Sequence, residues 1–252
     1  MKTKIMLEKV KVIGELIKQI RQNNNLINQD LDRHAQLVEE LKRLVADEEV
    51  QSYTDGIEEI LVLIDINKGF TIMGNYQNPY MNALVEPTNE EALKIHQLDN
   101  QMILVVNESH HEGSREFTTL NPDNPLPHCI EGTEEVKYAE DLQWILDEYP
   151  VFEKNTTMAA HAPGYLDMFY IFPNLKRVRF AGGVTDICYF EAVLSTIKFF
   201  DQNDIHCEVV AEQELYDTYD APWHSRDEWT EMTNKFMTQA GVKLIKRNMR
   251  GR

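Results

Sequence analysis

Gly183-Val184-Thr185-Asp186-Ile187-Cys188 is the stretch that decides how this chain folds. It follows an apolar run, residues 177–181, with the composition of a buried strand, and it precedes residues 190–200, whose apolar side chains recur at helical spacing. A strand that ends at glycine and passes directly into a helix is the repeating unit of α/β sheets. The stretch therefore predicts an α/β fold with Cys188 at the carboxyl edge of a sheet, where such folds bind their ligands.

Cys188 is a candidate nucleophile because of this position. At the start of the predicted helix, free backbone N–H groups and the helix dipole favour the thiolate and lower the pKa of a thiol. The alternative is a small buried apolar residue, which is the usual environment of a lone cysteine. The stretch alone leaves both interpretations open.

Two other predicted strands end in charged residues. Asp65 ends the run 59–65, and Lys154 ends the short run 151–154. Because the carboxyl ends of parallel strands meet at one edge of a sheet, we expect Asp65, Lys154 and Cys188 to lie close together. A carboxylate beside a thiol can accept its proton, and a lysine can stabilise the anionic state that results.

Apolar strands alternate with amphipathic helices from Ile60 onward. The predicted strands cover residues 60–66, 102–107, 151–154, 177–182, 206–211 and 242–246. The predicted helices cover about 88–100, 134–148, 165–172, 186–202 and 224–240. Such alternation predicts a mostly parallel sheet with helices on both faces, so we assign residues 57–252 to one α/β domain.

Residues 1–56 have a different pattern. Two segments with apolar residues three and four positions apart are separated by the polar run Asn23-Asn24-Asn25. We predict an N-terminal helical hairpin that packs on the α/β domain or on a neighbouring subunit, because isolated helices of this length are marginal in water. A partly disordered acidic leader is the alternative. We expect this extension to take no part in the chemistry.

The composition excludes several classes of partner. A net charge of −17 over 252 residues argues against binding to nucleic acid or to an anionic membrane. The three cysteines, Cys129, Cys188 and Cys207, contain no C-x-x-C pair, so we expect reduced thiols and a cytoplasmic location. No apolar stretch reaches the roughly 18 residues of a membrane span. We expect a soluble homo-oligomer with a small-molecule substrate.

The connection between residues 108 and 134 is too long for an ordinary loop, which makes it a candidate functional segment. Glu108 and His110 lie two positions apart, so their side chains share one side of an extended segment. Carboxylate and imidazole groups suit a divalent ion such as Zn²⁺, Mn²⁺ or Fe²⁺. A polar loop with solvent-facing side chains is the alternative.

Taken together, these residues resemble a known superfamily. Asp65 with Phe70, then Lys154, then Gly-Val-Thr-Asp-Ile-Cys188 is similar to the Asp–Lys–Cys triad of the isochorismatase-like cysteine hydrolases, which include the nicotinamidases. The resemblance runs from about Ile60 to the C-terminus. It implies an isochorismatase-like fold for residues 57–252.

The resemblance also implies one divalent metal ion. Nicotinamidases bind a metal through an acidic residue, a histidine two positions on, and a histidine in a Pro-His-Cys-x-x-Gly-Thr element, often with a further histidine or acid between. The matching residues here are Glu108, His110, Glu116 and His128. The first ligand is usually Asp rather than Glu, and Pro125-Leu126 stands where a bulky aromatic residue is usual. The first departure changes the expected geometry of the metal site, and the second changes the expected pocket for the substrate ring.

The implied activity is hydrolysis of nicotinamide to nicotinate and ammonia, a step in NAD salvage. Cys188 would attack the amide after Asp65 takes its proton, and Phe70 would lie against the substrate ring. The metal would hold the ring nitrogen.

The turn before Cys188 would provide the oxyanion hole through the backbone N–H groups of Val184 and Cys188. The resemblance also implies a cis peptide bond in this turn, between Val184 and Thr185. Asp186 has a simpler alternative role as the N-cap or as a first-turn acid of the following helix.

Other functions are compatible with these residues. A vinyl-ether-cleaving isochorismatase of the same fold would need neither Cys188 nor a metal. A metal-independent amidase acting on another small amide, such as a carbamoyl or ureido compound, would use the triad alone. A non-catalytic interaction protein, with the N-terminal hairpin as its binding part, would retain only the fold.

Overall fold

Six parallel strands form one sheet in the computed structural model, which describes residues 2–24, 31–120 and 122–246. The strands are β1 (Glu59–Ile64), β2 (Gln101–Glu108), β3 (Val151–Lys154), β4 (Arg177–Gly183), β5 (Glu208–Asp217) and β6 (Lys243–Ile245). Their order across the sheet is β3-β2-β1-β4-β5-β6, and each neighbouring pair is parallel. The predicted parallel α/β sheet is confirmed.

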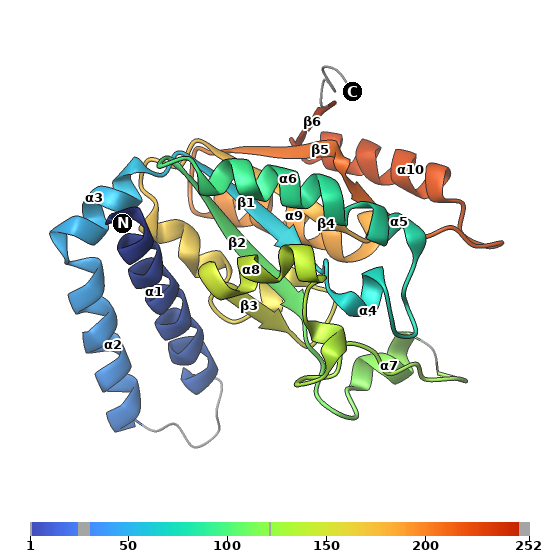
Figure 1. The fold of residues 1–252 in the computed structure, drawn as a ribbon, viewed down its shortest axis with the longest axis horizontal. Helices are drawn as coiled ribbons and strands as arrows, with labels where there is room; N and C mark the ends of the chain where they lie inside the picture. The colour runs from blue at the N-terminus through green and yellow to red at the C-terminus, as the bar shows by residue number, and fades with distance from the viewer. Residues whose placement is uncertain (1, 25–30, 121, 247–252) are drawn as a thin grey trace.

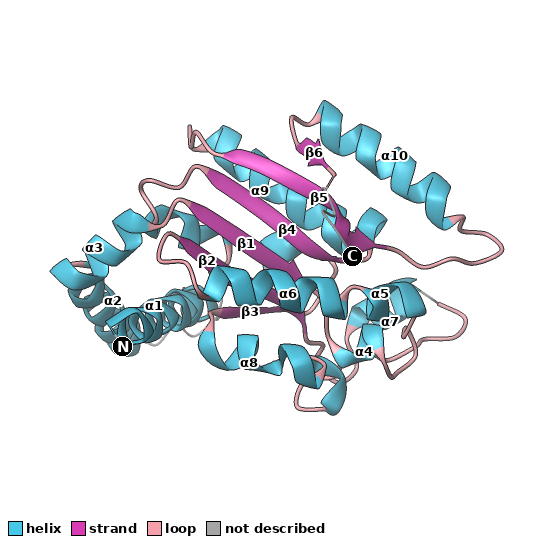
Figure 2. Ribbon diagram, turned by 45° about the horizontal axis from the view of Figure 1, so that its top comes forward, coloured by secondary structure: helices cyan, strands magenta, loops and turns pink. Residues whose placement is uncertain are grey.

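Strands β1 and β2 are nearly continuous apolar runs because both of their faces are covered. Helix α6 (Val85–His96) and helix α9 (Phe190–Gln202) lie on opposite faces of the sheet (Figure 2). The remaining helices of this region are α4 (Lys68–Thr71), α5 (Pro79–Ala83), α7 (Arg115–Leu120), α8 (Glu140–Glu148) and α10 (Arg226–Gln239). Helices on both faces are therefore confirmed as well.

Three predicted helices differ in detail from the structure. The predicted helix 165–172 is a 3₁₀ segment, Leu166–Ile171, which lies between Pro163-Gly164 and Pro173. The predicted helix 134–148 is divided, because Tyr138 forms a bridge with Asn67 between the 3₁₀ turn Glu134–Val136 and α8. The predicted helix 186–202 begins with a π-helical turn, Thr185–Tyr189.

Within residues 2–24 and 31–56, the N-terminal segment contains three helices rather than a hairpin of two: α1 (Lys2–Asn24), α2 (Leu31–Val45) and α3 (Glu48–Gly56). The third helix starts after Asp47, whose side chain accepts hydrogen bonds from the backbone N–H groups of Glu49 and Val50. Part of the predicted polar break, Asn25, lies outside the described residues. Figure 1 shows these helices at one end of the molecule, and α4, α5 and α7 beyond the carboxyl ends of the strands.

Helix α1 packs directly against the edge of the sheet at β3 and against α8. Val10 and Ile13 are fully buried in the main apolar core. At Gly14 an added Cβ would lie only 3.1 Å from Pro150 Cβ, so glycine permits this close approach. The apolar stripe of the N-terminal segment thus faces the α/β domain, which was one of its two predicted positions.

Two glycines let β4 pass closely between its neighbours. A Cβ on Gly182, whose φ is +123°, would lie 1.9 Å from Ile64 O of β1. A Cβ on Gly183 would lie 2.7 Å from Asp217 O of β5. These positions require glycine, which explains why the strand before Cys188 ends in this pair. Within the described ranges, no helix is long and apolar enough to cross a membrane.

Candidate active site

Four adjacent strands each bring one side chain to the carboxyl edge of the sheet. Asp65 follows β1, Glu108 ends β2, Lys154 ends β3, and Cys188 lies in the turn after β4. Lys154 Nζ lies 2.7 Å from Asp65 Oδ2 and 2.9 Å from Glu108 Oε2. The structure thus brings the predicted triad together. It also adds Glu108, which sequence reasoning had placed only at the metal site.

The cluster is almost completely buried, with Asp65, Glu108 and Lys154 each 1% exposed. Burial opposes the charge of Lys154, but the surrounding Asp65, Cys188 and Glu108 outweigh burial and raise its pKa. Burial raises the pKa of Asp65 to about 6, although Lys154 attracts its charge. Burial also acts to raise the pKa of Glu108, but Lys154 and the neighbouring histidines hold that pKa well below its usual range. The buried ammonium of Lys154 therefore forms ion pairs with two buried carboxylates, those of Asp65 and Glu108.

The thiol of Cys188 lies between these carboxylates. Its Sγ donates a weak hydrogen bond to Glu108 Oε2 at 3.6 Å, and a carboxylate oxygen of Asp65 lies within 4.8 Å of it. Burial raises the pKa of Cys188; Lys154 lowers it, and the two carboxylates raise it further, to a level well above the usual value. The expected lowering by a helix terminus is therefore wrong for this structure, because burial and the carboxylates outweigh it. These surroundings favour the neutral thiol of Cys188 over its thiolate.

The turn that carries Cys188 is tightly wound. Val184 O accepts hydrogen bonds from Ile187 N at 3.1 Å and from Tyr189 N at 3.2 Å. The cis peptide bond lies between Gly183 and Val184, one position before the expected Val184–Thr185 bond, because the chain leaves the strand at Gly183. The assignment of the Val184 and Cys188 N–H groups to an oxyanion hole stays a prediction.

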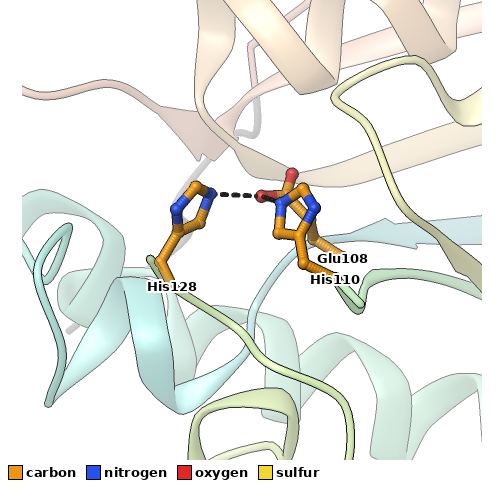
Figure 3. Close-up of side chains that lie close together, drawn as sticks. All are labelled: Glu108, His110 and His128. Atoms are coloured by element: carbon orange, nitrogen blue, oxygen red, sulfur yellow. Dashed lines mark hydrogen bonds and ion pairs between the residues drawn. The ribbon is translucent and has the colours of Figure 1, made fainter. Parts of the chain in front are cut away.

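Glu108, His110 and His128 form a second buried group that shares Glu108 with the first. Glu108 Oε1 lies 2.8 Å from Nε2 of each histidine, and the rings converge on it from two segments of the chain (Figure 3). The other ring nitrogens also face acceptors: His128 Nδ1 lies 2.9 Å from Leu126 O, and His110 Nδ1 lies 3.3 Å from Asn155 Oδ1. Such partners direct Nε2 toward a shared point, as in metal sites.

Glu116 lies beside this group rather than in it. Its Oε1 accepts hydrogen bonds from Thr157 N at 3.1 Å and from Thr156 Oγ1 at 3.3 Å. Its Oε2 is buried without a hydrogen-bond partner in the described structure. A buried carboxylate oxygen with no partner is costly, so Oε2 is free to bind a cation or a water molecule. The fourth-ligand role of Glu116 stays a prediction.

Aromatic rings surround His128. The predicted Phe70 lies edge-on at 5.9 Å between ring centroids, Tyr76 at 4.6 Å and Phe117 at 5.3 Å. Sequence reasoning missed Tyr76 and Phe117, because neither lies in a motif. Tyr76 comes from the segment after α4, so an aromatic ring reaches this site although Pro125-Leu126 provides none.

Comparison with known proteins identifies the fold. No protein-family model matches the sequence, and no curated protein is significantly similar to it. Among solved structures, the nicotinamidase/pyrazinamidase of Acinetobacter baumanii aligns with a TM-score of 0.59 at 18% identity, over 75% of this chain and 96% of that one. The N-carbamoylsarcosine amidase of Thermoplasma acidophilum aligns with a TM-score of 0.58 at 17% identity, over 77% and 100%. The zinc complex of a Pyrococcus horikoshii pyrazinamidase aligns with a TM-score of 0.58 at 18% identity, over 75% and 99%. The chain therefore has the α/β fold of the isochorismatase-like hydrolases, the fold that these amidases share.

Proposed function

We propose that this protein is a cysteine amide hydrolase that converts nicotinamide into nicotinate and ammonia. The observation that carries the proposal is the single buried cluster in which Asp65, Lys154 and Cys188 adjoin two histidines through Glu108. The fold of the neighbouring nicotinamidases supports the same reaction class. In a cell, the product would serve NAD salvage.

Asp65 is the better placed of the two carboxylates to act as the base. Both oxygens of Glu108 already have partners, since Oε1 faces the two histidines and Oε2 faces Lys154. Asp65 Oδ2 faces Lys154, but its Oδ1 is buried with no hydrogen-bond partner in the described structure. A free acceptor beside a neutral thiol is the arrangement that proton transfer requires.

The first half of the reaction forms a thioester. Asp65 takes the proton from Cys188, and Sγ forms a bond to the amide carbon while the carbonyl oxygen becomes an oxyanion. The N–H groups of Val184 and Cys188 would stabilise that oxyanion, and one such donor is typically worth about 10²–10³ in rate. Asp65 then gives the proton to the amide nitrogen, the C–N bond breaks, and ammonia leaves.

The second half consumes water. Asp65 takes a proton from a water molecule, whose oxygen attacks the thioester carbon. The C–S bond breaks, nicotinate leaves, and the Cys188 thiolate recovers the proton from Asp65. Lys154 keeps its charge throughout and holds the two carboxylates apart from each other.

The residues present suit one divalent ion, zinc, manganese or iron. Glu108, His110 and His128 would hold it, and the unpartnered Glu116 Oε2 would bind it directly or through water. When bound, the ion would coordinate the pyridine nitrogen and so orient the ring. Phe70 and Tyr76 would contribute aromatic surface beside that ring.

Nicotinamide and benzamide separate this proposal from a general amidase, because benzamide keeps the ring and the amide but lacks the nitrogen. We expect ammonia release from nicotinamide to be far faster, and removal of the metal by a chelator to abolish most of the difference. Metal content of the purified protein is measured alongside. Equal rates on both amides, or no ammonia from either, would refute the nicotinamide assignment.

One observation favours a second candidate, a metal-independent amidase acting on a carbamoyl compound. Glu108 is tied to Lys154 as well as to the histidines, so the charge of Lys154 competes with a cation for this carboxylate. The N-carbamoylsarcosine amidase has the same fold. This candidate predicts ammonia release from a carbamoyl compound that is unaffected by a chelator.

A further inference from the structure

Asp186, two residues before Cys188, is held by a loop that the reaction described above does not use. Its side chain is only 5% exposed and accepts hydrogen bonds from Thr218 Oγ1 at 2.6 Å and from His224 Nε2 at 3.0 Å. Both donors belong to the loop that connects β5 to α10. Asp186 is therefore an acid in the first helical turn but not its N-cap, and it connects the turn Thr185–Tyr189, which carries Cys188, to this loop.

The loop is closed at its base and again near its tip. Asp217, the last residue of β5, and Arg226, the first of α10, form two hydrogen bonds of 2.7 Å each. Between them, the backbones of Ala221 and His224 exchange hydrogen bonds of 3.0 and 2.9 Å. A charge-assisted bidentate pair is among the stronger polar contacts. The loop thus presents His224 from a defined position.

The imidazole ring of His224 is itself fixed in orientation. The Tyr219 ring stacks on it with centroids 3.8 Å apart, and the Trp229 ring stacks at 5.0 Å with an interplanar angle of 2°. Nδ1 of the ring lies 3.1 Å from Tyr219 O, which leaves Nε2 facing Asp186. Stacking and hydrogen bonding together define where the Asp186 carboxylate can lie.

We propose that His224 is a positioning residue that acts through Asp186 on the turn Thr185–Tyr189, which carries Cys188. Asp186 lies in the same π-helical turn as Cys188, and the turn is closed by two hydrogen bonds to Val184 O. A displacement of Asp186 would therefore redirect the N–H groups of Val184 and Cys188, which form the oxyanion hole in the proposed reaction. This inference rests on the proposed function.

Two reagents for Cys188 distinguish this role from a general structural one. Iodoacetamide alkylates Sγ with loss of iodide and develops no oxyanion. Pyridine-3-carbaldehyde adds Sγ to its carbonyl carbon, the thiol proton ends on the carbonyl oxygen, and nothing leaves. That oxygen lies where the reaction develops its oxyanion. The affinity for the aldehyde therefore measures how well the oxyanion hole is formed, whereas the alkylation rate measures the reactivity of the Cys188 thiol.

The test compares His224→Leu, which removes the donor, with His224→Gln, whose amide N–H reaches a position similar to Nε2. Trp223→Ala is the matched control, since Trp223 is the adjacent residue and is 82% exposed. In His224→Leu we expect kcat and aldehyde affinity to fall about 10- to 100-fold, somewhat less than for a deleted oxyanion donor. KM and the alkylation rate of Cys188 should stay within twofold. His224→Gln should recover most of the loss, and Trp223→Ala should match the wild type.

Several results would overturn the inference. Unchanged kcat in a folded His224→Leu would do so, as would a parallel fall in alkylation rate, which would place the effect on the thiol. If His224→Leu does not fold, His224→Gln and Asp186→Asn decide: the first must be close to wild type and the second must show the aldehyde defect. A wild type that binds the aldehyde at Cys188 but hydrolyses no nicotinamide refutes only the proposed function. A wild type that does neither refutes both.

Discussion

Replacement of Ile13 by alanine tests whether the N-terminal helices and the α/β domain form one cooperative unit. Ile13 is fully buried where α1 meets the core of the sheet. Three carbons lost from a buried site cost about 2.4 kcal/mol at roughly 0.8 kcal/mol each, and an incompletely filled cavity brings the total to about 2–5 kcal/mol. For 252 residues at about 2.1 cal/mol/K each, the entropy of unfolding is about 0.53 kcal/mol/K, so a loss of about 3 kcal/mol lowers Tm by about 6 °C.

Tryptophan fluorescence is a suitable assay because all three tryptophans, Trp144, Trp223 and Trp229, lie outside the N-terminal helices. A shift of the fluorescence-detected transition in Ile13→Ala would show that α1 stabilises the α/β domain directly. Val12→Ala is the matched control, since Val12 is 37% exposed and its truncation should move Tm by about 1 °C or less. An unchanged fluorescence transition, with a separate loss of helical circular dichroism at lower temperature, would refute the reasoning. The division of the chain at residue 57 would then mark two independent folding units.

Three further predictions concern the site. Cys188→Ala should abolish amide hydrolysis while leaving the thermal transition in place, and iodoacetamide should label Cys188 before the fully buried Cys129, as peptide mass spectrometry would show; retention of appreciable turnover would remove the central claim. His110→Ala and His128→Ala should each lower the bound metal, measured by elemental analysis, because each removes one of three converging donors; unchanged metal content in both variants would exclude this site. The rate kcat/KM should fall as pH decreases through about 6, because Asp65 must be ionised to accept the thiol proton and burial raises its pKa to about 6; a profile that stays flat down to pH ~5 would exclude Asp65 as the base.

The sequence by itself determined the strands, most of the helices and the triad. Strand and helix patterns are local, so they can be read within a few residues, and parallel strands must place Asp65, Lys154 and Cys188 at one edge. The same rule applies to Glu108 at the end of β2, but the sequence analysis assigned this residue only to the metal site. Its second role was missed because the longer glutamate side chain reaches Lys154 and Cys188 only when β2 and β3 pair in the observed register, Glu108 opposite Lys154.

Only the tertiary structure decided the properties that depend on burial and on distant segments. The pKa of Cys188 is raised rather than lowered because burial and two carboxylates act on it together. The ring of Tyr76 reaches His128, and the imidazole of His224 reaches Asp186, from loops whose paths no local pattern encodes. Sequence periodicity reports which face of a segment is apolar, whereas the surroundings of a charged or reactive group depend on which elements pack together.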